Sequence, residues 1–124
     1  MIVVDTSALV DALTGSKRSA PKLRALLAEG YRLYLVSLVL YEWWRGPRLD
    51  EELAAQEALF PTNQALAFGT TEAHIAADLY RRLDRARGRE LDLAIAACAL
   101  TNEAAIWTLN RGDFIDIPGL ELLD

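Results

Sequence analysis

The sequence has 124 residues, of which 52% are hydrophobic and 25% are charged, so we expect one folded domain over residues 1–124. Its net charge of −5 argues against a protein that holds nucleic acid by charge alone, unless a bound cation reverses the local sign. A single cysteine and a single histidine exclude an internal disulfide and a Cys/His zinc site.

The first third of the chain predicts strands that alternate with short helices. We expect a buried strand at Ile2-Val3-Val4, a helix at 7–13, a helix at 19–30, a strand at 31–37 and a helix at 38–45. Ser19 and Ser37 stand where each of the last two helices needs an N-cap, and Gly30 stands where the second helix ends.

The rest of the chain continues this alternation. We expect a helix at 49–60, a short strand at 65–68, a long amphipathic helix at 71–87, an almost wholly apolar helix at 91–102, a strand at 104–109 and a further strand at 120–123. Strands that alternate with helices favour right-handed crossovers. We therefore predict an α/β fold, a three-layer α/β/α sandwich with a mainly parallel sheet.

The apolar stretches are short. None approaches the roughly 20 residues needed to cross a bilayer, and no basic region precedes the apolar residues at the N-terminus. We therefore expect neither a membrane span nor a signal peptide, and a cytoplasmic location is the default expectation.

Four acidic residues stand out from the solvated helix surface that accounts for most of the others. Asp5 follows the first strand, and Asp113 follows the strand at 104–109. Glu42 lies in the apolar and aromatic stretch "LVLYEWW", and Asp92 lies near the start of the apolar helix. Because parallel sheets present their sites at the carboxyl ends of the strands, we expect Asp5 and Asp113 to lie at the same edge.

Several carboxylates gathered at one place repel each other unless a cation joins them. Oxygen ligands suit Mg²⁺ or Mn²⁺, and a metal-bound water can be activated to attack a phosphodiester. The four acids are therefore candidates for a metal site.

Four segments, taken in order, resemble a known family. "VVDTSALVDAL", "SLVLYEWWRG", "RELDLAIAACAL" and "LNRGDFIDIPGLELL" are similar to the PIN-domain ribonucleases, in particular to VapC-type toxins of toxin–antitoxin pairs. The similarity extends over the whole chain, from Asp5 to the final "IPGLELL".

The resemblance implies that Asp5, Glu42, Asp92 and Asp113 form an acidic metal-binding and catalytic cluster. It also implies accessory polar roles for Thr6 or Ser7 and for Asn110, with a looser match at Asp116. Mg²⁺ or Mn²⁺ would be the cofactor, and RNA, cut endonucleolytically, the substrate. The expected partners are a second copy of the chain, in a homodimer, and a small antitoxin that blocks the site.

Each acid also has a purely structural interpretation. Asp5 is placed to cap the helix that follows, and Asp92 to stabilise the positive end of its own helix. Glu42 fits an exposed position beside tryptophans, and Asp113 fits a turn in "NRGD".

Two groups of residues are candidates for contact with RNA or a partner. One is the basic run Arg81, Arg82, Arg85, Arg87 and Arg89, together with Arg111, which fits an RNA track, an antitoxin contact or a solvated helix face. The other is Trp43 and Trp44, which point in different directions on a helix, so that one suits the core and the other a partner.

Other functions fit less well. A phospho-accepting receiver domain needs paired acids after the first strand and a late lysine, but both lysines, Lys17 and Lys22, come early. A haloacid-dehalogenase-like phosphatase needs a second Asp where Ser7 stands. Two alternatives stay open: an RNA-processing nuclease without a toxin role, and a PIN fold that serves as a catalytically silent binding module.

Overall fold

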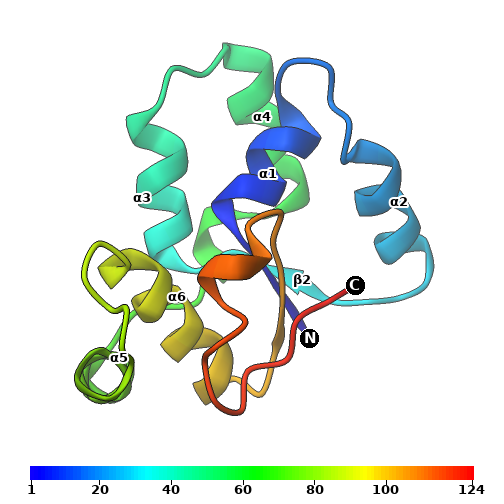
Figure 1. Ribbon diagram of the computed structural model, residues 1–124. Coiled ribbons are helices and arrows are strands. Elements are labelled where there is room, and N and C mark those ends of the chain that lie inside the picture. The colour runs from blue at the N-terminus through cyan, green and yellow to red at the C-terminus, as the bar shows by residue number, and fades with distance from the viewer.

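Three short parallel strands form the centre of the protein in the computed structural model, which describes residues 1–124 (Figure 1). Strand β1 (Ile2–Val4) lies between β2 (Leu33–Tyr34) and β3 (Ala105–Trp107), in the order β2-β1-β3. In this register Val3 is paired with Tyr34 on one side and with Ile106 on the other. All three strands therefore end at the same edge of the sheet.

Six α-helices surround this sheet. They are α1 (Thr6–Leu13), α2 (Ala20–Ala28), α3 (Ser37–Arg45), α4 (Asp50–Leu59), α5 (Thr70–Arg82) and α6 (Glu90–Thr101), with 3₁₀ turns η1 (Thr62–Gln64) and η2 (Arg111–Asp113). Helix α6 contacts β3, and α5 packs along α6, whereas α1 contacts α2, α3 and α4. Figure 1 shows α5 and α6 at the lower left of the molecule, α2 at the right and α4 at the top. The predicted α/β sandwich with a parallel sheet is confirmed.

The core lies where the central strand meets the apolar helix. Every residue of β1 is at most 2% exposed, and the run from Leu93 to Ala99 in α6 is buried on all sides of the helix. A strand covered on both faces needs apolar residues at consecutive positions, which is what Ile2-Val3-Val4 supplies. The prediction of a buried, mostly apolar helix is confirmed.

The predicted edge strands are shorter than expected. The strand expected at 31–37 is reduced to Leu33–Tyr34, followed by a single bridge between Val36 and Leu66. The strand expected at 120–123 is likewise a single bridge, between Leu122 and Ile106. Alternating apolar residues indicate which side chains face the core, but they do not determine how many backbone bonds a neighbour provides.

Helix α5 ends at Arg82, five residues before the predicted Arg87. Leu83 has an extended backbone, with φ −86° and ψ 140°, and the chain then turns so that Ala86 is buried. The charged and helix-favouring residues after Arg82 favour a longer helix, but burial of Ala86 in the core requires the chain to leave the helix axis.

Of the two predicted serine caps, Ser19 stands at the N-cap of α2 as expected, whereas Ser37 does not cap α3. Helix α3 begins at Ser37 itself, and the Ser37 hydroxyl accepts a hydrogen bond from the Phe68 backbone N–H instead. Ser19 occupies the cap position of α2, but its hydroxyl donates to Asp11 Oδ2 at 2.6 Å. In both cases a tertiary partner competes successfully with the first turn of the helix.

None of the helices has the length and apolar character that a membrane crossing requires.

Candidate active site

A polar cavity of about 540 Å³ opens at the carboxyl edge of the sheet. Its lining comes mainly from α1 and the loop that follows it, with further residues from α3, α6 and the segment after β3. Three of the four predicted acids line it, namely Asp5, Glu42 and Asp92, together with Thr6, Ser7 and Asn110.

Asp5 is the most buried of these acids, with only 4% of its surface exposed. Its Oδ2 accepts hydrogen bonds from the hydroxyls of Ser7 at 2.9 Å and Thr108 at 2.7 Å. Although Asp5 stands at the N-cap of α1, its carboxylate makes no capping hydrogen bond to a backbone N–H of that helix. The purely structural interpretation of Asp5 as a helix cap is therefore not supported.

Two hydroxyls hold Asp5 and also organise the chain after β3. Ser7 Oγ accepts a bond from the Leu109 N–H at 3.0 Å, and Thr108 Oγ1 accepts one from the Asn110 N–H at 2.9 Å. Each hydroxyl thus donates to the carboxylate and accepts from the backbone. Ser7 was among the residues for which an accessory role was expected, whereas Thr108 was not identified from the sequence. The one available signal was its position as the first polar residue after the apolar part of a strand.

Glu42 reaches the cavity from α3, with 20% of its side chain exposed. Its Oε1 accepts a 2.7 Å hydrogen bond from the Thr6 hydroxyl. Its Oε2 lies 3.7 Å from the Arg45 guanidinium, one turn further along the helix. Thr6 therefore orients Glu42 in the same way that Ser7 orients Asp5, and the two neighbouring hydroxyls serve two different acids.

Asp92 lies in the first turn of α6 and has the most perturbed acidity in the site. Partial burial, together with the charges of Asp113, Asp5 and Glu42, raises the pKa of its carboxyl from 3.8 to about 6, while the charge of Arg89 acts in the opposite direction. Because the charges of three other carboxylates act on Asp92, its carboxylate lies close to all three. The four acids from four separate segments are therefore brought to one region.

Asp113 is the least integrated of the four. It ends the 3₁₀ turn η2 and acts on Asp92 through its charge, but it does not line the main cavity. No group of three or more His, Cys, Asp or Glu side chains is arranged to hold a metal ion in the structure. The acids gather at one edge of the sheet without converging on one point.

The chemistry of this group of side chains nevertheless fits a divalent cation. The available donors are carboxylate and hydroxyl oxygens, which Mg²⁺ and Mn²⁺ prefer over nitrogen and sulfur. Mg²⁺ commonly uses only one or two carboxylates directly and retains bound waters, so it does not require three acids at bonding distance. A cation would also relieve the repulsion that raises the pKa of Asp92.

The predicted contact residues fall into different environments. Arg81 and Arg82 pair with Asp78 on the surface of α5, and Arg111 donates to the Leu123 carbonyl at 2.9 Å. Arg85 and Arg87 are exposed. Arg89 instead has only 12% of its side chain exposed and bonds to Asp116 at 2.7 Å. Asp116, which matches the family less closely than the four acids do, is therefore paired with Arg89. The Arg89 guanidinium binds other residues of the same protein.

The two tryptophans divide as expected between core and surface. Trp43 is completely buried, and the Arg48 guanidinium lies 4.3 Å from the centre of its ring. Trp44 is 50% exposed. Only Trp44 is available to a partner.

Comparison with known proteins gives a consistent result. The PIN domain family model matches residues 2–120. Ribonuclease VapC19 of Mycobacterium tuberculosis is 33% identical over 123 residues, covering 98% of each chain. The DNA-bound VapBC structure from Salmonella typhimurium aligns with a TM-score of 0.79 at 22% identity, covering 99% of this chain and 96% of that one. A toxin–antitoxin complex from Klebsiella pneumoniae aligns with a TM-score of 0.72, also at 22% identity, covering 97% and 95%.

Proposed function

Since this chain belongs to the PIN-domain family, we propose that it is a metal-dependent endoribonuclease that acts as the toxin of a toxin–antitoxin pair. The similarity to a protein named ribonuclease VapC19 supports the nuclease activity. The whole of residues 1–124 would form the single nuclease domain.

One observation carries the proposal. Beside the effect of burial, the charges of Asp113, Asp5 and Glu42 all raise the pKa of Asp92, although the four acids come from four segments of the chain. Mutual repulsion of this kind destabilises the fold, so its presence beside a polar cavity needs a compensating use. Binding a divalent cation provides that use.

In this proposal the four acids hold Mg²⁺ or Mn²⁺, directly or through metal-bound waters. Ser7 and Thr108 fix the rotamer of Asp5, and Thr6 fixes that of Glu42. Asn110 lines the same cavity, where its amide is placed to contact a phosphate or a water. When bound, the cation would supply charge stabilisation and an acidified water for attack on an RNA phosphodiester.

The proposal also includes the partners. Similarity to a VapBC structure and to a toxin–antitoxin complex supports a small antitoxin as partner. A homodimer and a cytoplasmic location are further parts of the proposal, and Trp44 with the exposed arginines Arg81, Arg82 and Arg85 are the candidate contact residues for RNA or a partner. An RNA-processing role without a toxin function would use the same site chemistry.

A second candidate function has one observation in its favour. Because no three acids are arranged to hold a metal ion, a catalytically silent PIN-fold binding module remains the rival. The two functions differ in their dependence on metal.

RNA cleavage by the purified protein separates them. We expect cleavage of a mixed RNA substrate in Mg²⁺ or Mn²⁺, none in EDTA, and none with Asp5→Asn or Asp92→Asn. The matched control is Asp78→Asn, which removes the same charge from the surface of α5 and should cleave normally. Absence of cleavage by the wild type in both metals, with the fold intact, would favour the binding module.

A further inference from the structure

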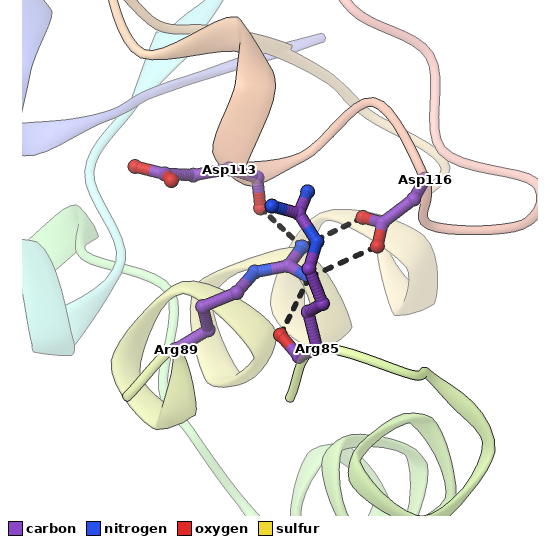
Figure 2. Close-up of polar contacts among 4 residues, drawn as sticks. All are labelled: Arg85, Arg89, Asp113 and Asp116. Carbon is purple, nitrogen blue, oxygen red and sulfur yellow. Dashed lines mark hydrogen bonds and ion pairs between the residues drawn. The ribbon is translucent and has the colours of Figure 1, made fainter. Parts of the chain in front are cut away.

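Arg89 makes four hydrogen bonds within the protein through its two terminal nitrogens (Figure 2). Its Nη1 donates to the Arg85 carbonyl and to Asp116 Oδ2, both at 2.9 Å. Its Nη2 donates to the Asp113 carbonyl at 2.6 Å and to Asp116 Oδ1 at 2.7 Å. The four hydrogens of the two terminal nitrogens are therefore all used within the protein.

These contacts join the two chain segments that carry two of the candidate ligands. Arg89 directly precedes α6, three positions before Asp92, and the carbonyl that it binds belongs to Asp113 itself. Both carboxylate oxygens of Asp116 accept hydrogen bonds from the guanidinium, and this bidentate contact fixes the orientation of the guanidinium plane. The backbone of η2 is thereby tied to the start of α6.

The arginine binds the backbone of Asp113 and leaves its carboxylate free. In Figure 2 the Asp113 side chain points away from the Arg89–Asp116 pair. A direct ion pair with that carboxylate would neutralise a charge that a cation needs. The charge of Arg89 is satisfied by Asp116 instead, and the pKa of the Asp116 carboxyl is lowered as a result.

We propose that Arg89 is a positioning residue, oriented by Asp116, that sets the spacing of Asp113 from Asp92. The inference rests on the proposed function, in which both acids hold the cation. It also excludes a direct RNA contact by Arg89, because no terminal N–H group is left for a phosphate. The Nε of Arg89 is buried and has no hydrogen-bond partner, so the hydrogen bonds of this side chain come from its two terminal nitrogens alone.

Arg85 offers a matched control. Its guanidinium also lowers the pKa of Asp116, yet its side chain makes no hydrogen bond and is exposed. Arg85→Gln therefore removes one positive charge near Asp116 while keeping the backbone carbonyl that Arg89 uses. Arg89→Gln removes the same charge together with the connection to Asp113.

The experiment has two readouts, hydrogen–deuterium exchange of residues 109–116 in EDTA and Mn²⁺ affinity followed by the EPR signal of free Mn²⁺. We expect Arg89→Gln and Asp116→Asn to speed exchange in this segment and to weaken Mn²⁺ binding by about tenfold or more, the usual effect of losing an outer-shell partner. Arg85→Gln should change neither readout. Exchange in β1 should be the same in all variants, which shows that the core is intact.

One further variant, Arg89→Lys, and the milder change Asp116→Asn keep the test decisive. Arg89→Lys retains the charge but cannot reproduce the planar fork, so it should behave like Arg89→Gln, and a full rescue would overturn the positioning role. Asp116→Asn, at a side chain that is 35% exposed, is the milder change if Arg89→Gln lowers the melting temperature too far.

The possible failures are distinguishable. If the wild type binds Mn²⁺ and Arg89→Gln and Asp116→Asn bind it equally well, this inference is overturned and the proposed function survives. If the wild type binds no Mn²⁺, the proposed function fails, and the positioning role fails with it.

Discussion

The Thr108 hydroxyl donates a 2.7 Å hydrogen bond to Asp5 Oδ2 across 103 positions of sequence. It joins the residue after β1 to the residue after β3, at the edge where both strands end. Both partners are buried, Asp5 with 4% and Thr108 with 5% of its surface exposed. The bond therefore contributes to the fold as well as to the orientation of a candidate ligand.

Replacing Thr108 by valine is expected to destabilise the protein. The variant keeps the shape of the side chain but leaves Asp5 with one donor fewer and leaves the Asn110 N–H without its acceptor. A buried polar group that loses its partner costs about 1–3 kcal/mol, and urea unfolding in EDTA measures it. Thr108→Ser keeps the hydroxyl, so its free energy of unfolding should fall much less than that of Thr108→Val. Equal stability of Thr108→Val and the wild type would show that the hydrogen bond is dispensable.

The raised pKa of Asp92 makes a prediction about pH. In the folded protein this carboxyl titrates at about 6, against 3.8 for the unperturbed group. The folded state therefore binds the proton more tightly, and its stability falls as pH rises from about 4 to 6. Above that window the ionised carboxylate is a constant destabilising contribution in the absence of metal.

Asp92→Asn removes this contribution. We expect the variant to be more stable than the wild type at pH 8 in EDTA, by about 1 kcal/mol once solvent screening of a half-buried group is allowed for, and equally stable below pH 4. Thermal unfolding across pH measures the difference. The control Asp78→Asn should show the opposite sign, because its ion pairs with Arg82 and Arg81 lower the pKa of Asp78. A stabilisation by Asp92→Asn that does not vary with pH would refute the assignment.

The sequence predicted the position of the site better than its supporting contacts. Asp5 ends an apolar strand, and Asp92 interrupts an apolar helix, so each is anomalous in its own local segment. Thr108 and Asp116 have no such local anomaly. Their importance comes from partners that are 103 and 27 positions away, Asp5 and Arg89, and no periodicity in a single segment reports such pairs.

The same distinction explains the errors in the fold. Helix α5 was predicted to run to Arg87 because its local residues favour helix, whereas the burial of Ala86 and the bond from Arg89 to Asp116, 27 positions away, depend on distant packing. Ser37 has the residue type of a cap, but a neighbouring segment supplies the donor for its hydroxyl. Local propensity identifies the elements, and tertiary contacts determine where they end.

The adjacent tryptophans should respond very differently to truncation. Trp43 is fully buried, so Trp43→Ala should cost about 3–5 kcal/mol, the usual loss for a large buried aromatic. Trp44 is half-exposed, so Trp44→Ala should change the stability of the isolated protein by less than about 0.5 kcal/mol. Urea unfolding at low protein concentration measures both. A large loss of stability in Trp44→Ala under these conditions would assign Trp44 to the fold and remove it as a candidate partner contact.

Metal binding makes the most direct prediction for the acidic site. A ligand that binds only the folded state raises the free energy of unfolding, by about 2.7 kcal/mol at a concentration one hundred times the dissociation constant. We expect Mn²⁺ and Mg²⁺ to raise the melting temperature of the wild type above its value in EDTA, and to have no such effect on Asp5→Asn. Asp78→Asn should respond as the wild type does, because its carboxylate lies on the surface of α5.

The arrangement of the acids extends this expectation to Asp113, because no three of them are arranged to hold a metal ion in the structure. Asp113 does not line the main cavity, so we expect it to move towards the cation when metal binds, either as a direct ligand or through a metal-bound water. Exchange in residues 109–116 should therefore slow on addition of Mn²⁺ in the wild type, and in Arg85→Gln, but much less in Arg89→Gln. A melting temperature unaffected by millimolar Mn²⁺ would mean that these acids repel one another without a cation to join them, and the nuclease proposal would then be abandoned for a binding module.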